Sequence, residues 1–555
     1  MVATNEAMDL TESQTEALAG VSRVAKSLRE IVDAALASGR ERTNGGRDID
    51  SHQVHTERLA NLATEVEAAE SLLAYAEQAA EHDDFAVETA AIFTAMVASR
   101  ARTSAFEQGD VFGVSSEQIE ATLGSAETQA FIRAGMDDRR IEALGQRVVD
   151  LGTTPDVWWE DDLERMTRDT VRSFARAEIA PHAQEIHMND DLVPESFITK
   201  MAEQGYFGLA IPEDYGGQGM SNVAMIVTTE ELSVASLAAA GSLITRPEIL
   251  SKALITGGTE EQKQAWLPKL ASGEIMAAIS VTEPDTGSDV ASVKVRAEKG
   301  ELDGVEGYFL NGAKAWCTFA GRANVIAMLT RTDPDVSLGA KGLSLFIVPK
   351  DSFEGHAFEM KQPHGGSISG KADRTPGYRG MHSYTLGIEN YFVPAENLVG
   401  GEGRGFVLQM GGFAAGRLQT GGRATGLSQA AIEAAAAYAN ERSQFGKTLG
   451  SYQLTQHKLG KMAVEVAAGR QLTYHAARIM DSGDYRSPVA AMAKLFTCDV
   501  AVRTTQEAQI LHGGWGYAEE YAISRFVVDA LVLPIFEGVK PILGLKVIGR
   551  SLLSA

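Results

Sequence analysis

The stretch "IMAAISVTEPDTGSDVASVKVRAE" (residues 275–298) marks the point where helical patterning gives way to β-rich patterning. From there to about residue 395, short β-rich runs are separated by Gly, Asn, Asp and Pro. No helix of useful length alternates with these runs. The pattern therefore favours a compact antiparallel β domain over βαβ units. The runs that we expect to form strands are "MAAISVT", "SVKVRAE", "YFLNG", "NVIAMLT" and "LSLFIVP".

Helical patterns lie on both sides of this stretch. In front of it, Leu59, Leu62 and Val66 recur at steps of three and four, which places them on one helix face. Behind it, from about Gly405, the chain is Ala-rich and amphipathic. We therefore predict a mainly α protein with a central β domain. The expected parts are an N-terminal helical extension over 1–150 that serves packing or oligomerisation, a helical domain over 151–274, the β domain over 275–395 and a C-terminal helical domain over 396–555.

The composition narrows the function classes. A chain of 555 residues with a net charge of -24 is expected to form several domains and to repel phosphate backbones and anionic lipid, so neither nucleic acid nor membrane is an expected partner. The two cysteines form no disulfide framework. The acidic N-terminus lacks a signal pattern, and no apolar stretch is long enough to span a bilayer, so a cytoplasmic location is expected.

Motifs for metals and nucleotides are weak. The 11 histidines form no H-E-x-x-H pattern and no Cys/His cluster, so no metal site is predicted. "GGSISGKA" (365–372) resembles a phosphate-binding loop, but Ala372 stands where Ser or Thr would reach Mg²⁺. No Gly-rich turn joins a strand to a helix in the way a Rossmann site requires.

One carboxylate is conspicuous. Glu537 lies in "LVLPIFEGVKPIL" (531–543), which is otherwise almost wholly apolar. A lone acid in such a stretch is costly unless it is paired, protonated or catalytic. Gly538 follows it and leaves room for a ligand to approach.

Three further segments suit a flat heteroaromatic ligand or a phosphate. "SVTEPDTGSDV" (280–290) offers hydroxyls in a turn, and "NGAKAWCTFAG" (311–321) places Trp316 and Thr318 on one side of a strand. "ERSQFGKTLGSYQ" (441–453) is a basic turn in which Arg442 could hold a phosphate. Taken singly, each segment favours a purely structural role.

Together these segments resemble the acyl-CoA dehydrogenase family over about residues 155–555. "VTEPDTGSD", "YFLNGAKAWCT", "AENLVGGEGRGF", "RSQFGKTLGSYQ", "HGGWGY" and "FEG" follow the order of that family's motifs. The resemblance implies a helical domain, a β-barrel-like domain and a C-terminal four-helix bundle, with FAD between the last two. It also implies an acyl-CoA substrate, a dimer or tetramer, and an electron-transfer flavoprotein as electron acceptor.

The resemblance also implies roles for individual residues. Glu537 would be the catalytic base, and its backbone N–H would face the thioester oxygen. Thr282, Trp316 and Thr318 would contact the flavin ring. Ser288 would approach the phosphates of CoA or FAD, while Arg417 and Gly538 would border the substrate. The residues expected to contact the FAD of a neighbouring subunit are Arg442, Phe445, Gln453, Gly513 and Gly514.

Two positions depart from the family pattern. Ile510 stands where the family carries a flavin-contacting Gln, and Val539 stands where Thr usually follows the Glu-Gly pair. Both departures put individual cofactor contacts in doubt, and neither lies at the reaction centre.

The extension over 1–150, with "GYRGMHSYTL" and "RQLTYHAARIMD", resembles the branch that oxidises (2S)-methylsuccinyl-CoA to mesaconyl-CoA. The free carboxylate of that substrate needs a cation, and Arg246 in "SLITRPEIL" is the candidate. The alternative for Arg246 is a solvent-facing side chain beside Pro247. The alternatives for the chain are a short-chain or branched-chain acyl-CoA dehydrogenase, an acyl-CoA oxidase, or a catalytically silent member that acts as an interaction scaffold.

Overall fold

The computed structural model describes residues 11–108, 110, 112–485 and 487–554. The chain divides into two compact units, one of residues 1–166 and 420–555 and the other of residues 167–419. Within the described part of the chain, no helix is both long and apolar enough to cross a membrane. The domain boundaries predicted from the sequence stay predictions.

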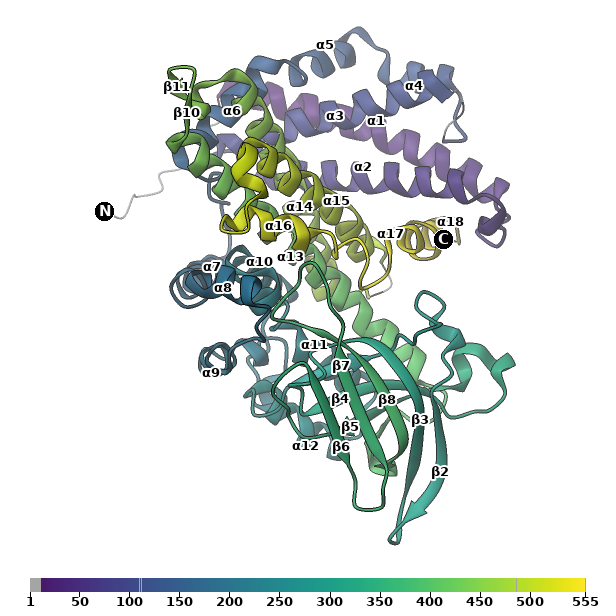
Figure 1. Ribbon diagram of the computed structural model, residues 1–555. Coiled ribbons are helices and arrows are strands. Elements are labelled where there is room, and N and C mark those ends of the chain that lie inside the picture. The colour runs from purple at the N-terminus through teal and green to yellow at the C-terminus, as the bar shows by residue number, and fades with distance from the viewer. Residues whose placement is uncertain (1–10, 109, 111, 486, 555) are drawn as a thin grey trace. The chain divides into compact units, whose positions relative to one another are not determined.

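The first unit is built from helices (Figure 1, purple to blue and green to yellow). Its N-terminal part contains α1 (Glu12–Arg42), α2 (Gln53–Ala79), α3 (Asp84–Gln108), α4 (Ser116–Leu123), α5 (Ala126–Gly135) and α6 (Asp138–Leu151). Thr11 and Ser115 begin α1 and α4 with capping boxes, in which the side chain at the cap and a Gln three residues on satisfy each other's backbone N–H groups. Leu59, Leu62 and Val66 are buried on α2, as their spacing predicts.

The C-terminal part of this unit packs against those helices. It contains the second half of α13 (Gly405–Glu441), then α14 (Gln453–Asp481), α15 (Val489–Leu511), α16 (Ala522–Ala530), α17 (Lys540–Ile542) and α18 (Arg550–Ser554). A two-stranded ribbon of β10 (Ser443–Gln444) and β11 (Lys447–Thr448) joins α13 to α14. Helices α2, α3 and α6 contact α14, and α2 also contacts α15.

The second unit combines helices with the sheet. Its helices are α7 (Asp162–Phe174), whose first turn belongs to the other unit, α8 (Ala180–Asn189), α9 (Glu195–Glu203), α10 (Asn222–Ala235), α11 (Thr245–Gly257), α12 (Glu260–Ala271) and the start of α13. Leu250 and Leu254 of α11 and Leu267 of α12 pack on buried strand residues such as Val325 and Ile347. This apolar layer fixes one face of the sheet on the helices.

The strands of this unit are β1 (Ala277–Ser280), β2 (Arg296–Leu302), β3 (Val305–Thr318), β4 (Val325–Arg331), β5 (Leu343–Pro349), β6 (Ala357–Lys361), β7 (Ser367–Ala372), β8 (Ser383–Pro394) and β9 (Leu398–Val399). They form one sheet in the order β6-β7-β8-β3-β2-β4-β5-β9, with β1 beside β4 (Figure 1).

The expected fold class, mainly α with a central β domain, is confirmed. The sheet itself is mixed where an antiparallel one was expected, because β1 and β2 both pair with β4 in parallel. Strand β5 has the predicted bounds, whereas β2 begins four residues later than predicted. Residues Val290–Ser292 form a short 3₁₀ turn, and the Glu283 carboxylate accepts the next backbone N–H groups, from Lys294 and Val295.

Candidate active site

Glu537 lies in a turn after α16, in a backbone conformation that is rare for its residue type. Its φ is 52° and that of Gly538 is 99°. The backbone of a residue other than glycine is strained in the left-handed region, and such strain persists only where the surrounding structure holds it. Strained residues of this kind cluster at active sites.

Contacts from α15 and α13 hold this turn in place. Lys494 of α15 is 1% exposed, and its Nζ donates to the carbonyl of Gly538 at 2.5 Å. One turn further along α15, the Cys498 thiol donates to the carbonyl of Leu533 at 3.3 Å. The guanidinium of Arg423 lies 4.7 Å from the centre of the Phe536 ring. None of these supporting residues was predicted, because they stand more than 30 residues away in a helical pattern that signals only packing.

The carboxylate of Glu537 combines burial with an open hydrogen-bonding position. The residue is half-buried, and its Oε2 atom is buried without a hydrogen-bond partner among the described residues. Buried polar atoms are nearly always hydrogen-bonded, so this exception suits an oxygen that acts on a ligand. The sequence prediction that this acid has a special role gains support from this arrangement.

The other predicted residues of the first unit are at its surface. Phe445 is 96% exposed at the tip of the β10–β11 ribbon, with φ values of 52° for Phe445 and 86° for Gly446. Arg442 and Gln453 flank this ribbon and are exposed. Gly513 and Gly514 follow α15, and a Cβ at either position would meet nothing within 4 Å. An exposed Phe held in a strained turn is available for contact with a ligand or partner.

Trp316 and Thr318 lie at the end of β3 in the second unit. The register of β3 with β8 shifts between Lys314 and Cys317, and Trp316 within this bulge has a φ of 56°. The indole is 58% exposed, whereas the next residue, Cys317, is fully buried. The hydroxyl of Thr318 is 2.8 Å from that of Ser383. The bulge thus turns a large aromatic ring outward from a buried strand.

The predicted hydroxyl-bearing loop is fixed to this strand. The carbonyl of Thr282 accepts the N–H of Ala315 at 2.9 Å, so the loop and the Trp316 segment are brought together. Ser288, further along the loop, is exposed. Arg417 lies half-buried on α13.

A buried ion pair ties the loop to β3, and sequence analysis missed it. Lys314 is fully buried, and its Nζ lies 3.1 Å from Oε1 of Glu283 and donates to the carbonyl of Val281 at 2.8 Å. Burial lowers the pKa of Lys314 to about 8, although Glu283 opposes this shift. The sequence carried a signal for this pair, since Glu283 and Lys314 stand inside the two motifs that also carry Thr282 and Trp316.

Arg246 is buried, so the alternative of a solvent-facing Arg is wrong. It is 5% exposed in the first turn of α11, where its Nε donates to the carbonyl of Ser242 at 3.1 Å and its Nη2 to the hydroxyl of Thr245 at 2.9 Å. Its charge also acts on Cys317 of β3: burial raises the pKa of this thiol to about 12, and a hydrogen bond with Ser280 and the charge of Arg246 oppose that shift. Arg246 therefore lies near the strand that carries Trp316.

The predicted residues thus form two groups. Thr282, Trp316, Thr318 and Arg246 belong to one unit, and Glu537 with its supporting turn belongs to the other.

The two departures from the family pattern have visible consequences. Val539 is the N-cap of α17, and its side chain makes no capping hydrogen bond. A Thr hydroxyl at this position could accept a hydrogen bond from a backbone N–H of the helix. Ile510 is 63% exposed, while the neighbouring Gln509 donates to the carbonyl of Gly516 at 2.9 Å. Neither residue supplies the polar group that the family pattern has there.

Comparisons with known proteins identify the class of protein. The model of the acyl-CoA dehydrogenase N-terminal domain matches residues 161–274, and that of the middle domain matches residues 278–391. The model of the C-terminal domain matches residues 403–553 and also residues 12–116. The chain belongs to the acyl-CoA dehydrogenase family. It is an FAD-dependent oxidoreductase.

Individual relatives place it within the family. It is 45% identical to (2S)-methylsuccinyl-CoA dehydrogenase of Cereibacter sphaeroides over 396 residues, which are 71% of this chain and 70% of the relative. It is 34% identical to mitochondrial isovaleryl-CoA dehydrogenase of Solanum tuberosum over 393 residues, 71% of this chain and 91% of the relative. These identities support the methylsuccinyl-CoA branch of the family that the sequence predicted.

Solved structures agree with the family. Butyryl-CoA dehydrogenase of Megasphaera elsdenii superposes with a TM-score of 0.65 at 30% identity, covering 71% of this chain and 99% of that chain. Glutaryl-coenzyme A dehydrogenase in its glutaryl-CoA complex superposes with a TM-score of 0.63 at 32% identity, covering 70% of this chain and 94% of that chain. A chain from work on the electron transferring flavoprotein of Acidaminococcus fermentans gives 0.63 at 31% identity, with coverages of 71% and 98%.

Proposed function

We propose that this enzyme oxidises (2S)-methylsuccinyl-CoA to mesaconyl-CoA, with Glu537 as the catalytic base. The 45% identity to a methylsuccinyl-CoA dehydrogenase carries the choice of substrate, since the Solanum tuberosum isovaleryl-CoA dehydrogenase reaches only 34%. The strained, half-buried Glu537 with its unpartnered oxygen supports the choice of base.

The reaction removes a proton and a hydride from neighbouring carbons. The Glu537 carboxylate takes the α-proton of the thioester, and the electron pair left behind forms the new carbon–carbon double bond as the β-hydrogen departs with its own pair. The acceptor for that hydride would be supplied by bound FAD. The backbone N–H of Glu537 donates to the thioester oxygen, where negative charge develops as the proton leaves. Gly538 leaves the space that the thioester needs.

The exposed groups at the two units suit the cofactor. Trp316 offers a flat face to the flavin ring, and the hydroxyls of Thr282 and Thr318 offer hydrogen bonds to its edge. Arg442, with Phe445 and Gln453, would contact the FAD of a neighbouring subunit. Open backbone at Gly513 and Gly514 would let that cofactor approach closely. Ser288 would face a phosphate of CoA or FAD.

Arg246 is the proposed partner of the substrate's free carboxylate. A guanidinium matches a carboxylate geometrically, and burial strengthens the pairing because water does not compete. The hydrogen bonds to Ser242 and Thr245 fix the orientation of the guanidinium. Arg417 is proposed to border the same substrate.

The experiment that tests the substrate is anaerobic reduction of the purified flavoprotein. We expect methylsuccinyl-CoA to bleach the flavin absorbance with a kcat/KM at least about tenfold above that of butyryl-CoA or isobutyryl-CoA, because only the first substrate carries a second carboxylate. Equal or faster bleaching by butyryl-CoA or isobutyryl-CoA would instead assign the chain to the short-chain or branched-chain dehydrogenases.

The substitution Arg246→Met tests carboxylate recognition. Losing a charged hydrogen-bond partner costs about 2 kcal/mol, so we expect kcat/KM for methylsuccinyl-CoA to fall about thirtyfold, with butyryl-CoA turnover changed much less. Lys252→Met, on the same helix, is the control. A loss of equal size with both substrates would remove Arg246 from the substrate site.

The proposed electron acceptor is an electron-transfer flavoprotein. The similarity to a chain studied with such a flavoprotein supports this choice. Steady-state turnover with an electron-transfer flavoprotein is expected to exceed turnover with O₂ as the only acceptor. Faster turnover with O₂ and release of hydrogen peroxide would identify an oxidase.

A further inference from the structure

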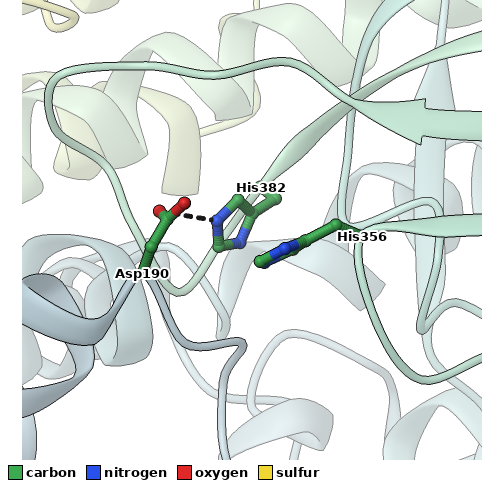
Figure 2. A group of neighbouring side chains, drawn as sticks. All are labelled: Asp190, His356 and His382. Carbon is green, nitrogen blue, oxygen red and sulfur yellow. Dashed lines mark hydrogen bonds and ion pairs between the residues drawn. The ribbon is translucent and has the colours of Figure 1, made fainter.

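Asp190, His356 and His382 form a cluster that the proposed reaction does not use. One donor atom of each residue lies within 4.8 Å of a donor atom of both others. Figure 2 shows the ring of His382 between the Asp190 carboxylate and the imidazole of His356. All three belong to the second unit, and up to 192 residues separate them in the chain.

The end of α8 fixes Asp190. This residue is the C-cap of the helix, with a φ of 58°, and its N–H donates to the carbonyl of His187 at 3.3 Å. The N–H of Asp191 donates to the carbonyl of Ile186 at 3.0 Å. Asp tolerates this left-handed position better than most residues, and the paired backbone groups hold it there.

The strand directions place the two histidines at the same end of the sheet. His356 directly precedes β6 and His382 directly precedes β8, and both strands are antiparallel to β7 between them. Their first residues therefore lie at the same end of the sheet. The backbone N–H of Ala372 donates to the carbonyl of His356 at 2.8 Å, and that of Phe319 donates to the carbonyl of His382 at 2.8 Å. These hydrogen bonds fix both positions.

The chemical state of His382 suits a metal ligand. The residue is 6% exposed, its Nε2 lies 3.1 Å from Oδ1 of Asp190, and its Nδ1 is buried with no hydrogen-bond partner in the described part of the chain. Burial lowers the pKa of His382, and the carboxylate of Asp190 opposes that shift. Arg379, whose Nε is 3.3 Å from Oδ1 of Asp190, is the competing cation.

We propose that Asp190, His356 and His382 bind a divalent transition-metal ion of the zinc class. Two imidazoles and one carboxylate are a common ligand set for such ions. Ligand bonds of about 2.1 Å require the donor atoms to lie within about 4.2 Å of each other, so the exposed His356 would have to turn toward the other two ligands. His382 also lines a cavity of about 260 Å³.

The ion would cross-link the end of α8 to the end of the sheet at which β6 and β8 begin. The carbonyl of His382 holds the N–H of Phe319, and the next residue, Ser383, lies 2.8 Å from the Thr318 hydroxyl. The site therefore stiffens the end of β3 where Thr318 stands. The sequence predicted no metal site, because Asp190, His356 and His382 are too far apart in the chain for any spacing motif to capture.

The test is zinc binding by the untagged flavoprotein after removal of metals with EDTA. We expect isothermal titration calorimetry with ZnCl₂ to give one ion per chain, and the melting temperature to rise at that stoichiometry. His356→Ala should weaken zinc binding at least tenfold, and because His356 is exposed the variant should fold as the parent does. His364→Ala is the matched control, since His364 is also exposed, in the β6–β7 hairpin, and lies outside the cluster.

Two outcomes would overturn the proposal. The first is a parent protein that binds no stoichiometric zinc, which would leave the cluster as the hydrogen bond of Asp190 with His382 and the ion pair of Asp190 with Arg379. The second is equal affinity in the parent and in His356→Ala. Both readouts are independent of dehydrogenase activity, so the failure of the metal site and the failure of the proposed reaction are distinguishable.

Discussion

At the residue scale, Glu537 combines a strained backbone with an unsatisfied carboxylate oxygen. Its φ of 52° and the φ of 99° at Gly538 place two consecutive residues in conformations that side chains disfavour. At Glu537 such strain costs of order 1–3 kcal/mol and needs a rigid surrounding to persist, whereas Gly538 carries no such cost. Lys494 and Cys498, which bond the carbonyls of Gly538 and Leu533, provide that surrounding.

Replacing the base should abolish chemistry while sparing the cofactor. In Glu537→Gln the amide keeps the size of the side chain but cannot take a proton, so we expect turnover to fall more than about 100-fold with the flavin spectrum unchanged. Stopped-flow flavin reduction measures this effect, and Glu520→Gln, which is exposed, is the control. Turnover within tenfold of the parent would exclude Glu537 as the base.

Lys494, which holds the turn that carries Glu537, should affect kcat by positioning the base. Lys494→Met keeps the length of the side chain but removes the donor to the Gly538 carbonyl, so we expect kcat to fall about tenfold as the base loses its alignment. Lys540→Met is the matched control, because Lys540 belongs to the same segment and pairs with Asp499 at 2.5 Å, with its own side chain 37% exposed. Similar kinetics for the two variants would show that the turn does not depend on Lys494.

At the element scale, the Glu283–Lys314 pair joins the loop over 280–290 to β3. Glu283 is 7% exposed and also accepts the N–H groups of Lys294 and Val295, so one carboxylate organises three segments. This network explains why the region before β2 is a turn although its sequence suits a strand. Local propensity yielded to a buried charge that needs hydrogen-bond donors.

Breaking this pair should destabilise the protein. Lys314→Met leaves the Glu283 carboxylate buried without its cation, and removing one member of a buried ion pair costs about 3–5 kcal/mol. Urea unfolding measures the loss for Lys314→Met, Glu283→Gln and the double variant. We expect the double variant to lose less than the sum of the single losses, and simple additivity would contradict direct coupling.

At the scale of the whole molecule, the same family model matches residues 12–116 and 403–553. The first of these stretches forms α1, α2 and α3, which pack in one unit with helices of the second stretch. The role in packing that the sequence suggested for the N-terminal extension gains support from these contacts. The sequence had not indicated that this extension resembles the C-terminal domain.

Where α6 and α14 cross, a glycine on each helix lets the two backbones approach closely. A Cβ on Gly145 would lie 1.6 Å from the carbonyl oxygen of Gln456, and one on Gly460 would lie 2.1 Å from that of Ile141. Only glycine allows two helix backbones to approach so closely. The extension is therefore fitted to α14 by two residues that carry no side chain.

We expect Gly145→Ala to destabilise the first unit by about 3 kcal/mol, because backbone must move to admit one methyl group. Helix propensity alone would favour Ala over Gly by about 1 kcal/mol, so the sign of the change separates packing from propensity. Ala143→Gly, at an exposed position of the same helix, is the control. Calorimetric melting measures both, and a stabilised Gly145→Ala variant would contradict the close crossing.

Sequence by itself determined the order of helices and strands, because periodicity follows from which faces are buried. It also singled out Glu537 and Trp316, since a lone acid in an apolar run and a Trp beside hydroxyls are local signals. Tertiary structure alone decided the parallel pairing of β1 with β4 and the burial of Arg246. It also decided the supporting contacts from Lys494 and the meeting of Asp190 with two histidines. The reason is physical: spacing along the chain encodes local geometry, whereas long-range packing brings distant residues together, and no local pattern records which ones meet.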